Sequence, residues 1–191
     1  MPYLHQAAER TRPYDPPQDN VLLVTCMDLR LIDNMIEFMN HDNLCNRYDH
    51  IVFAGAALGA LGAPGGTDEC GDPNEKPAWH ETFKDHLAAA VALHKVKDVY
   101  IVEHRGCGAY SKVFHIFGEH DDADVELKWH AHYAQKLEAF IHDWSTANSW
   151  PIVVRKFIMD LRGDVALLPD SSGTVGRSKG RSAKKSRPKK A

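Results

Sequence analysis

Runs of apolar residues that alternate with longer helical patterns are the feature that most constrains the fold of this chain. The runs are typical of strands buried on both faces of a sheet, and they lie at residues 21–24, 50–54, 99–102 and 151–159. Apolar residues spaced three and four apart, which indicate helices, recur over residues 32–39, 79–95 and 125–145. Strands that alternate with helices predict an α/β fold with a mostly parallel central β-sheet flanked by helices.

Two further stretches refine this prediction. A turn at residues 162–164 leads into a short apolar segment at 165–168, so we expect the last two strands to form a hairpin. Residues 55–62 are mostly glycine and alanine, which predicts a close approach of backbone to backbone there.

Charge divides the 191-residue chain unevenly. Residues 176–191 carry eight of the 23 lysines and arginines and no acidic residue, whereas the remainder has 15 basic against 26 acidic residues. We expect an N-terminal arm at 1–20, one α/β domain at 21–170 and a disordered basic tail at 171–191. Such a tail either contacts an anionic partner or only keeps the protein soluble.

The cellular compartment is predicted from two kinds of apolar segment that the sequence does not show. No apolar run approaches the roughly 18 residues of a membrane span, and the N-terminal segment has no apolar core of a secretory signal. We expect a cytoplasmic protein whose thiols stay reduced, which makes metal binding a better use for cysteine than a disulfide. For Cys45 and Cys70 we expect the role of small buried apolar side chains.

Two polar motifs follow two of the predicted strands. The first is Cys26-Met27-Asp28-Leu29-Arg30, and the second is His104-Arg105-Gly106-Cys107-Gly108. The carboxyl ends of parallel strands meet at one edge of a sheet, so we expect Cys26, His104 and Cys107 to lie together. Two thiolates and one imidazole are good zinc ligands, and three protein ligands leave the fourth position open, as in catalytic sites.

The first motif also supplies two groups beside the predicted zinc. Asp28 is placed to accept a hydrogen bond from a bound water, and Arg30 to hold Asp28 by a bidentate ion pair that keeps it ionised. An Asp and an Arg two residues apart also occur as a helix cap or a surface ion pair. The presence of all these residue types at two strand ends favours the zinc site.

The paired motifs resemble those of the β-carbonic anhydrases, which carry Cys-x-Asp-x-Arg after the first strand and His-x-x-Cys-Gly after a later one. The resemblance spans roughly residues 21–168 and includes the late stretch Asp160-Leu161-Arg162-Gly163. It implies a zinc lyase that interconverts carbon dioxide and bicarbonate through zinc-bound hydroxide, with Asp28 orienting the hydroxide and Arg30 fixing Asp28. It also implies a homodimer or a multiple of dimers, with either water or Asp28 as the fourth zinc ligand at rest.

The chain departs from that family beside its motifs. Met27 and Leu29 stand where small residues are usual, Glu103 replaces the usual glycine before the histidine, and Val52-Phe53 replaces Arg-Asn. These changes predict a bulkier and less polar pocket wall. Carbonyl sulfide and carbon disulfide, which relatives of this fold hydrolyse, are the alternative substrates.

A different class of function would use the basic tail. The protein would then be a binding or scaffold protein with a purely structural zinc. A structural site is normally closed by a fourth Cys or His, and neither Cys45 nor Cys70 has ligand-like spacing to the motifs. A regulatory homologue without activity would be expected to lack a ligand, Asp28 or Arg30, and all five are present.

Several of the 12 histidines are candidates for proton transfer, because an imidazole titrates near neutral pH. The candidates on the predicted helices are His80, His86, His94, His130 and His132. For each of them we expect a surface or interface position. His86 and His94 lie near the apolar side of their helix and are expected to be partly buried.

Overall fold

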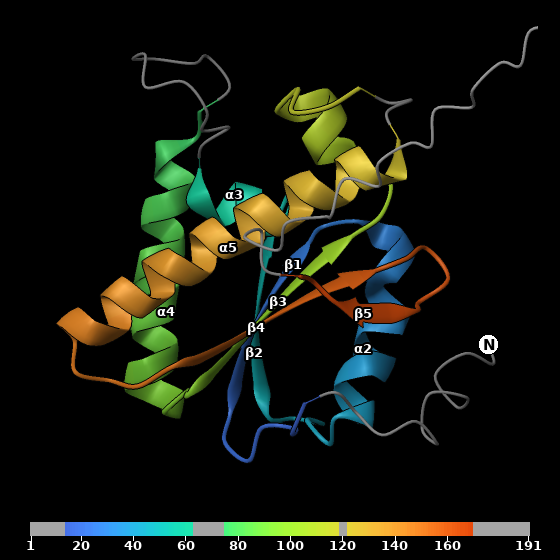
Figure 1. Ribbon diagram of the computed structural model, residues 1–191. Coiled ribbons are helices and arrows are strands. Elements are labelled where there is room, and N and C mark those ends of the chain that lie inside the picture. The colour runs from blue at the N-terminus through green and yellow to red at the C-terminus, as the bar shows by residue number, and fades with distance from the viewer. Residues whose placement is uncertain (1–13, 63–74, 119–121, 170–191) are drawn as a thin grey trace, which may run out of the picture.

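Residues 14–62, 75–118 and 122–169 are described by a computed structural model of the protein (Figure 1). Most of the predicted N-terminal arm, the whole of the predicted tail and Cys70 lie outside these residues.

A five-stranded sheet forms the centre of the described part. Its strands are β1 (Val21–Cys26), β2 (Tyr48–Phe53), β3 (Asp98–His104), β4 (Val153–Met159) and β5 (Val165–Leu167). They lie in the order β2-β1-β3-β4-β5. The first four strands are parallel, and β5 pairs antiparallel with β4. The predicted α/β fold and the predicted hairpin are therefore confirmed.

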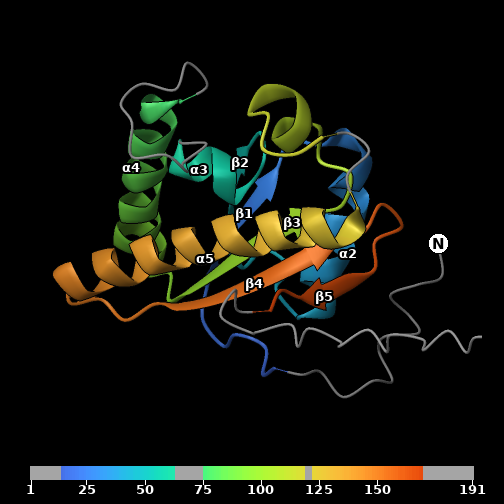
Figure 2. The ribbon, with the colours of Figure 1, turned by 45° about the horizontal axis from the view of Figure 1, so that its top comes forward.

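Helices cover both faces of the sheet. They are α2 (Ile32–His41), α3 (Ala57–Leu61), α4 (Pro77–His94) and α5 (Ala123–Ala147), with a 3-10 turn η1 (Leu29–Leu31) and a π-helical turn η2 (Ala109–Val113). Figures 1 and 2 show α5 running across the sheet on the side of α3 and α4, with α2 on the opposite side. None of the helices in the described residues contains an apolar stretch that could span a membrane.

The sheet is buried because successive side chains of its central strands face opposite layers. In β1, Leu22 and Val24 pack toward α4 and α5, whereas Val21 and Leu23 pack toward α2. All four are fully buried. Burying both faces anchors the central strands and so fixes the positions of the residues at their ends.

Helix α2 turns a different face to the sheet from the one that the spacing predicts. Met35 and Met39 are buried as expected, but the third buried residue is Phe38. Ile32 and Ile36, which belong to the predicted face, are 59% and 46% exposed. The apolar stripe of α2 is thus wider than the surface that the sheet covers.

Three expectations about burial are wrong. Cys45 is exposed, because it lies in the turn between α2 and β2 rather than under a helix. His86 and His94 are exposed as well, since α4 buries its opposite side through Phe83, Leu87 and Ala90. His130, expected at a surface or interface, is fully buried in α5.

Candidate metal centre

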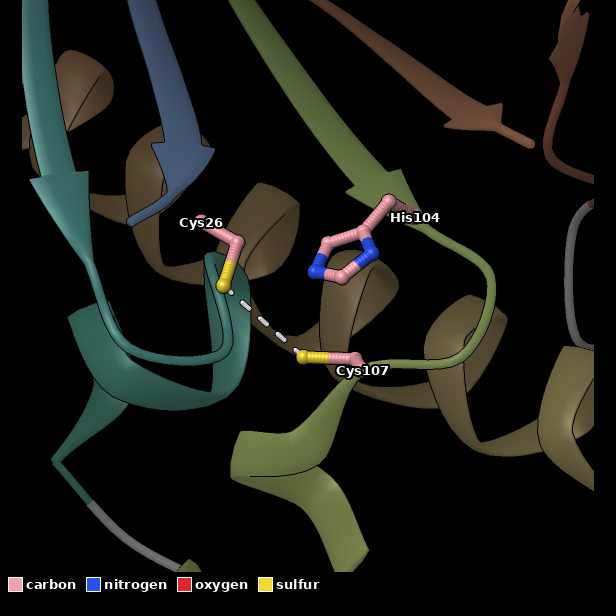
Figure 3. Close-up of side chains that lie close together, drawn as sticks. All are labelled: Cys26, His104 and Cys107. Atoms are coloured by element: carbon pink, nitrogen blue, oxygen red, sulfur yellow. Dashed lines mark hydrogen bonds between the residues drawn. The ribbon is translucent and has the colours of Figure 1, made fainter. Parts of the chain in front are cut away.

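The sheet brings the two sequence motifs together. Strand β1 pairs directly with β3, so that Thr25 lies beside Val102. Cys26 is the last residue of β1 and His104 is the last residue of β3, while Cys107 follows in the loop before η2. Figure 3 shows the three side chains converging from these positions. As predicted, Cys26, His104 and Cys107 lie close together at one edge of the sheet.

The spacing of the three side chains fits a single metal ion. Their ligand atoms all lie within 4.8 Å of one another. The two sulfur atoms are 3.8 Å apart, and neither cysteine forms a disulfide. Two sulfurs each about 2.3 Å from one tetrahedral zinc would lie about 3.8 Å apart.

The imidazole of His104 is oriented for ligation. Its Nδ1 lies 2.9 Å from the carbonyl oxygen of Arg105 and donates to it, which leaves the lone pair on Nε2. Nε2 is buried and has no hydrogen-bond partner among the described residues. A buried polar atom without a partner is costly, and a metal ion would satisfy it.

The thiols carry negative charge where a cation would bind. The hydrogen bond from Cys107 lowers the pKa of Cys26 to about 4, against the opposing effect of burial, and His104 adds to the lowering. The same hydrogen bond, together with burial, raises the pKa of Cys107. The backbone N–H of Gly55 also donates to the Cys26 sulfur at 3.3 Å. The pair therefore holds a thiolate at neutral pH, and a divalent cation would favour a second one.

Asp28 and Arg30 form the predicted bidentate pair. Arg30 Nε donates to Asp28 Oδ1 at 2.8 Å, and Nη2 donates to Oδ2 at 2.5 Å. Arg30 Nη2 also donates to the carbonyl of Gly106 at 3.1 Å, which ties the pair to the second motif. Asp28 Oδ2 lies 3.9 Å from His104 Nε2. The hydrogen bonds from Arg30 lower the pKa of Asp28 to about 2, so this carboxylate is ionised at neutral pH.

Removing the guanidinium should release this hold on Asp28. In metal-free Arg30→Ala, we expect the pKa of Asp28 to rise from about 2 toward its ordinary value of 3.8, as followed by NMR of the side-chain carboxyl carbon. Because the folded-state pKa is the lower one, the pair stabilises the fold above about pH 3.8 and loses this effect as the pH falls toward 2. Arg162→Ala, which breaks a similar pair with Asp160, is the matched control. Titration of Asp28 near pH 2 in Arg30→Ala would contradict the assignment.

A pocket of about 400 Å³ opens beside the site between α2 and β2, and Cys26 and Asp28 are part of its wall. Most of the remaining wall is apolar and comes from Met27, Leu31, Ile32, Met35, Ile36 and Val52. The predicted apolar character of this wall is therefore present, with Met27 and Val52 contributing to it. Leu29, Phe53 and Glu103, which were also expected to change this wall, are not among the lining residues. Leu29 is 81% exposed, and Glu103 is fully buried.

One histidine that the sequence analysis did not single out lies in the same pocket wall. His50 is in β2, and its Nε2 lies 2.7 Å from the hydroxyl of Thr25. Burial lowers the pKa of His50, so its ring is largely neutral at neutral pH. No sequence motif indicated a role for His50, because it lies within the edge strand β2 and outside the two polar motifs.

The small-residue stretch contributes a donor as well as space. Gly55 has φ +84°, and a Cβ there would meet the Cβ of Ala109 at 3.3 Å. This conformation directs the Gly55 N–H at the Cys26 sulfur. The composition of the stretch predicted a close backbone approach. It did not predict that the Gly55 N–H would contact the candidate ligand Cys26.

Comparisons with known proteins give two sequence relatives. No family model matches the chain. An uncharacterized protein of Rickettsia bellii is 32% identical over 95 residues, which are 49% of this chain and 51% of the relative. An uncharacterized protein of Rickettsia conorii is 30% identical over 92 residues, which are 48% of this chain and 43% of the relative. The chain thus matches about half the length of these curated relatives.

Similar solved structures come from carbonic anhydrases. The carbonic anhydrase of Streptococcus mutans has a TM-score of 0.46 at 15% identity, over 87% of this chain and 91% of that one. A β-carbonic anhydrase of Trichomonas vaginalis has a TM-score of 0.39 at 16% identity, over 88% and 92%. A tetrameric β-carbonic anhydrase of Sordaria macrospora has a TM-score of 0.41 at 15% identity, over 87% and 86%.

Proposed function

We propose that the protein is a zinc-dependent enzyme that interconverts carbon dioxide and bicarbonate. The observation that carries the proposal is the cluster of Cys26, His104 and Cys107, whose donor atoms lie within 4.8 Å of one another beside an ionised aspartate. In the described part of the chain, no fourth cysteine or histidine joins this cluster. Three protein ligands favour a catalytic over a structural zinc.

Each residue has a separate task in this proposal. Cys26, His104 and Cys107 would hold the zinc ion. This ion would act as a Lewis acid that lowers the pKa of water. Asp28 Oδ2 accepts a hydrogen bond from the attacking water and so orients its lone pair toward the substrate. Arg30 keeps that carboxylate ionised and fixed through its two side-chain contacts.

The wall of the pocket favours small apolar molecules. Its apolar side chains line the same pocket as Asp28 and Cys26. None of these apolar side chains carries a positive charge that could bind an anionic product. Carbon dioxide fits such a wall, and so do carbonyl sulfide and carbon disulfide. Hydrolysis of these sulfur analogues is the second candidate function.

A direct comparison of substrates tests the proposal. Zinc-loaded protein is mixed with carbon dioxide in a stopped-flow instrument and, in parallel, with carbonyl sulfide or carbon disulfide while released sulfide is measured. Rapid hydration of carbon dioxide with little sulfide release supports the proposed activity. The reverse result would assign the sulfur compounds as substrates, and inactivity toward all three would reject a hydrolytic zinc site.

We also propose that the protein assembles as a homodimer or a multiple of dimers. Support comes from the exposed apolar side chains around the pocket, which include Met27, Ile32, Ile36 and Val52, on and beside the edge strand β2. A second copy that covers them would remove this surface from water. Light scattering coupled to size-exclusion chromatography measures the mass, and a monomer at micromolar concentration would contradict this assembly.

A further inference from the structure

Two ionisable side chains are fully buried close to the loop that carries His104 and Cys107. Glu103, near the end of β3, and His130, in α5, both have no exposed side-chain surface. A buried carboxylate is costly unless it is paired and hydrogen-bonded. Neither residue is one of the three candidate ligands or belongs to the Asp28–Arg30 pair.

The contacts of Glu103 link three segments of the site. Its Oε2 lies 2.8 Å from His130 Nδ1. Its Oε1 accepts a hydrogen bond from the backbone N–H of Ala57 at 2.9 Å. Ala57 follows the Gly55 turn whose N–H donates to Cys26. Glu103 therefore connects the end of β3 to α5 and to the turn beside Cys26.

A second carboxylate of α5 extends this connection to the loop itself. Glu126 lies one helical turn before His130, and its Oε1 is 3.6 Å from His130 Nε2. The same oxygen accepts the backbone N–H of Gly106 at 2.5 Å, and the other oxygen lies 3.4 Å from Arg105 Nη1. Glu126 thus contacts both residues that separate His104 from Cys107.

We propose that Glu126, which lies beside the buried His130–Glu103 pair, is a positioning residue that fixes the loop between His104 and Cys107 in its ligating conformation. This inference rests on the proposed metal site. Gly106 has φ +66°, a conformation that the loop adopts here between two candidate ligands. Anchoring its N–H on Glu126 of α5 and its carbonyl on Arg30 restrains the peptide groups on both sides of Gly106. A restrained loop loses less conformational freedom when the metal binds.

The charge on Glu126 agrees with this role. Burial disfavours the ionised form, but the contacts with His130 and with the Gly106 N–H outweigh it and lower the pKa of Glu126 to about 2. An ionised acceptor makes a stronger hydrogen bond to a backbone N–H than a neutral one does.

Binding of Co²⁺, which replaces zinc and reports its surroundings by its visible and near-ultraviolet bands, tests the proposal. For Glu126→Ala we expect cobalt affinity to fall by about 10–100-fold, as for other residues that orient metal ligands, with altered thiolate-to-cobalt bands. Glu126→Gln retains an acceptor oxygen for Gly106, and we expect it to restore the wild-type bands and most of the affinity.

Glu138→Ala is the matched control. Glu138 lies on the same helix, and its removal breaks an ion pair of 2.5 Å with the buried Lys156. We expect this variant to lose thermal stability but to bind cobalt like the wild type. Wild-type bands and affinity in Glu126→Ala would overturn the positioning role alone. An equal loss in Glu126→Gln or in Glu138→Ala would also overturn it. Wild-type protein that takes up no cobalt would overturn the metal site and this inference with it.

Discussion

Replacing Cys107 with serine should leave the protein folded but unable to hold zinc. Cys107 is 1% exposed, and its sulfur lies 3.8 Å from that of Cys26. A serine hydroxyl is not ionised at neutral pH and is a poor zinc ligand, so one of two charge-neutralising donors is lost. The fall in affinity should exceed the ~10–100-fold that follows the loss of a residue that only orients a ligand. Metal analysis after dialysis and competition with a chromophoric chelator measure it.

Cys45→Ser separates this effect from a general response to the loss of a thiol. Cys45 is exposed and takes no part in the cluster, so this variant should keep one zinc per chain. Circular dichroism checks that both variants fold. Wild-type zinc affinity in Cys107→Ser would show that the metal, if any, binds elsewhere.

Replacing Asp28 with alanine should leave the zinc in place and remove most of the activity. Asp28 is not one of the three clustered donors, although its carboxylate lies 3.9 Å from His104 Nε2. In the proposed mechanism it acts on the reacting water, and loss of a positioned proton acceptor typically costs about 10²–10⁴-fold in rate. Stopped-flow hydration of carbon dioxide, with zinc content determined on the same sample, measures both properties.

Asp160→Ala is a control of similar local geometry. Asp160 accepts hydrogen bonds from the backbone N–H and the Nε of Arg162, as Asp28 does from Arg30, but it lies after β4 and outside the cluster. We expect its hydration rate to stay within a few-fold of wild type. Full activity in Asp28→Ala would remove Asp28 from the proposed chemistry.

The strands of the sheet were predictable from the sequence because the signal lies in the buried strands themselves. The apolar runs at 21–24 and 99–102 fall inside β1 and β3, but both strands continue to the polar residues Cys26 and His104. Pairing with neighbouring strands decides where β1 and β3 end, and an apolar run in the sequence does not indicate this pairing. Helix α3 was missed because its five residues are too few to show a helical period.

The candidate ligands were predictable for a related reason. Cys26 and His104 directly follow apolar runs, and parallel strands place such residues at one edge. The partners of Glu103 were not predictable, because they depend on how α5 lies across the sheet, and His130 is 27 positions away. The only sequence signal was a charged residue at the end of an otherwise apolar strand. The exposed face of α2 was missed because spacing identifies an apolar stripe without saying what covers it.

Zinc K-edge X-ray absorption of the zinc-loaded protein tests most directly the claim that two cysteines and one histidine hold a zinc with one position left for chemistry. For a zinc ion held by Cys26, His104 and Cys107, we expect two sulfur ligands at about 2.3 Å and two nitrogen or oxygen ligands at about 2.0 Å. Three or four sulfur ligands would indicate a different and closed site. A shell without sulfur would place the metal away from Cys26 and Cys107 and contradict the proposed zinc site.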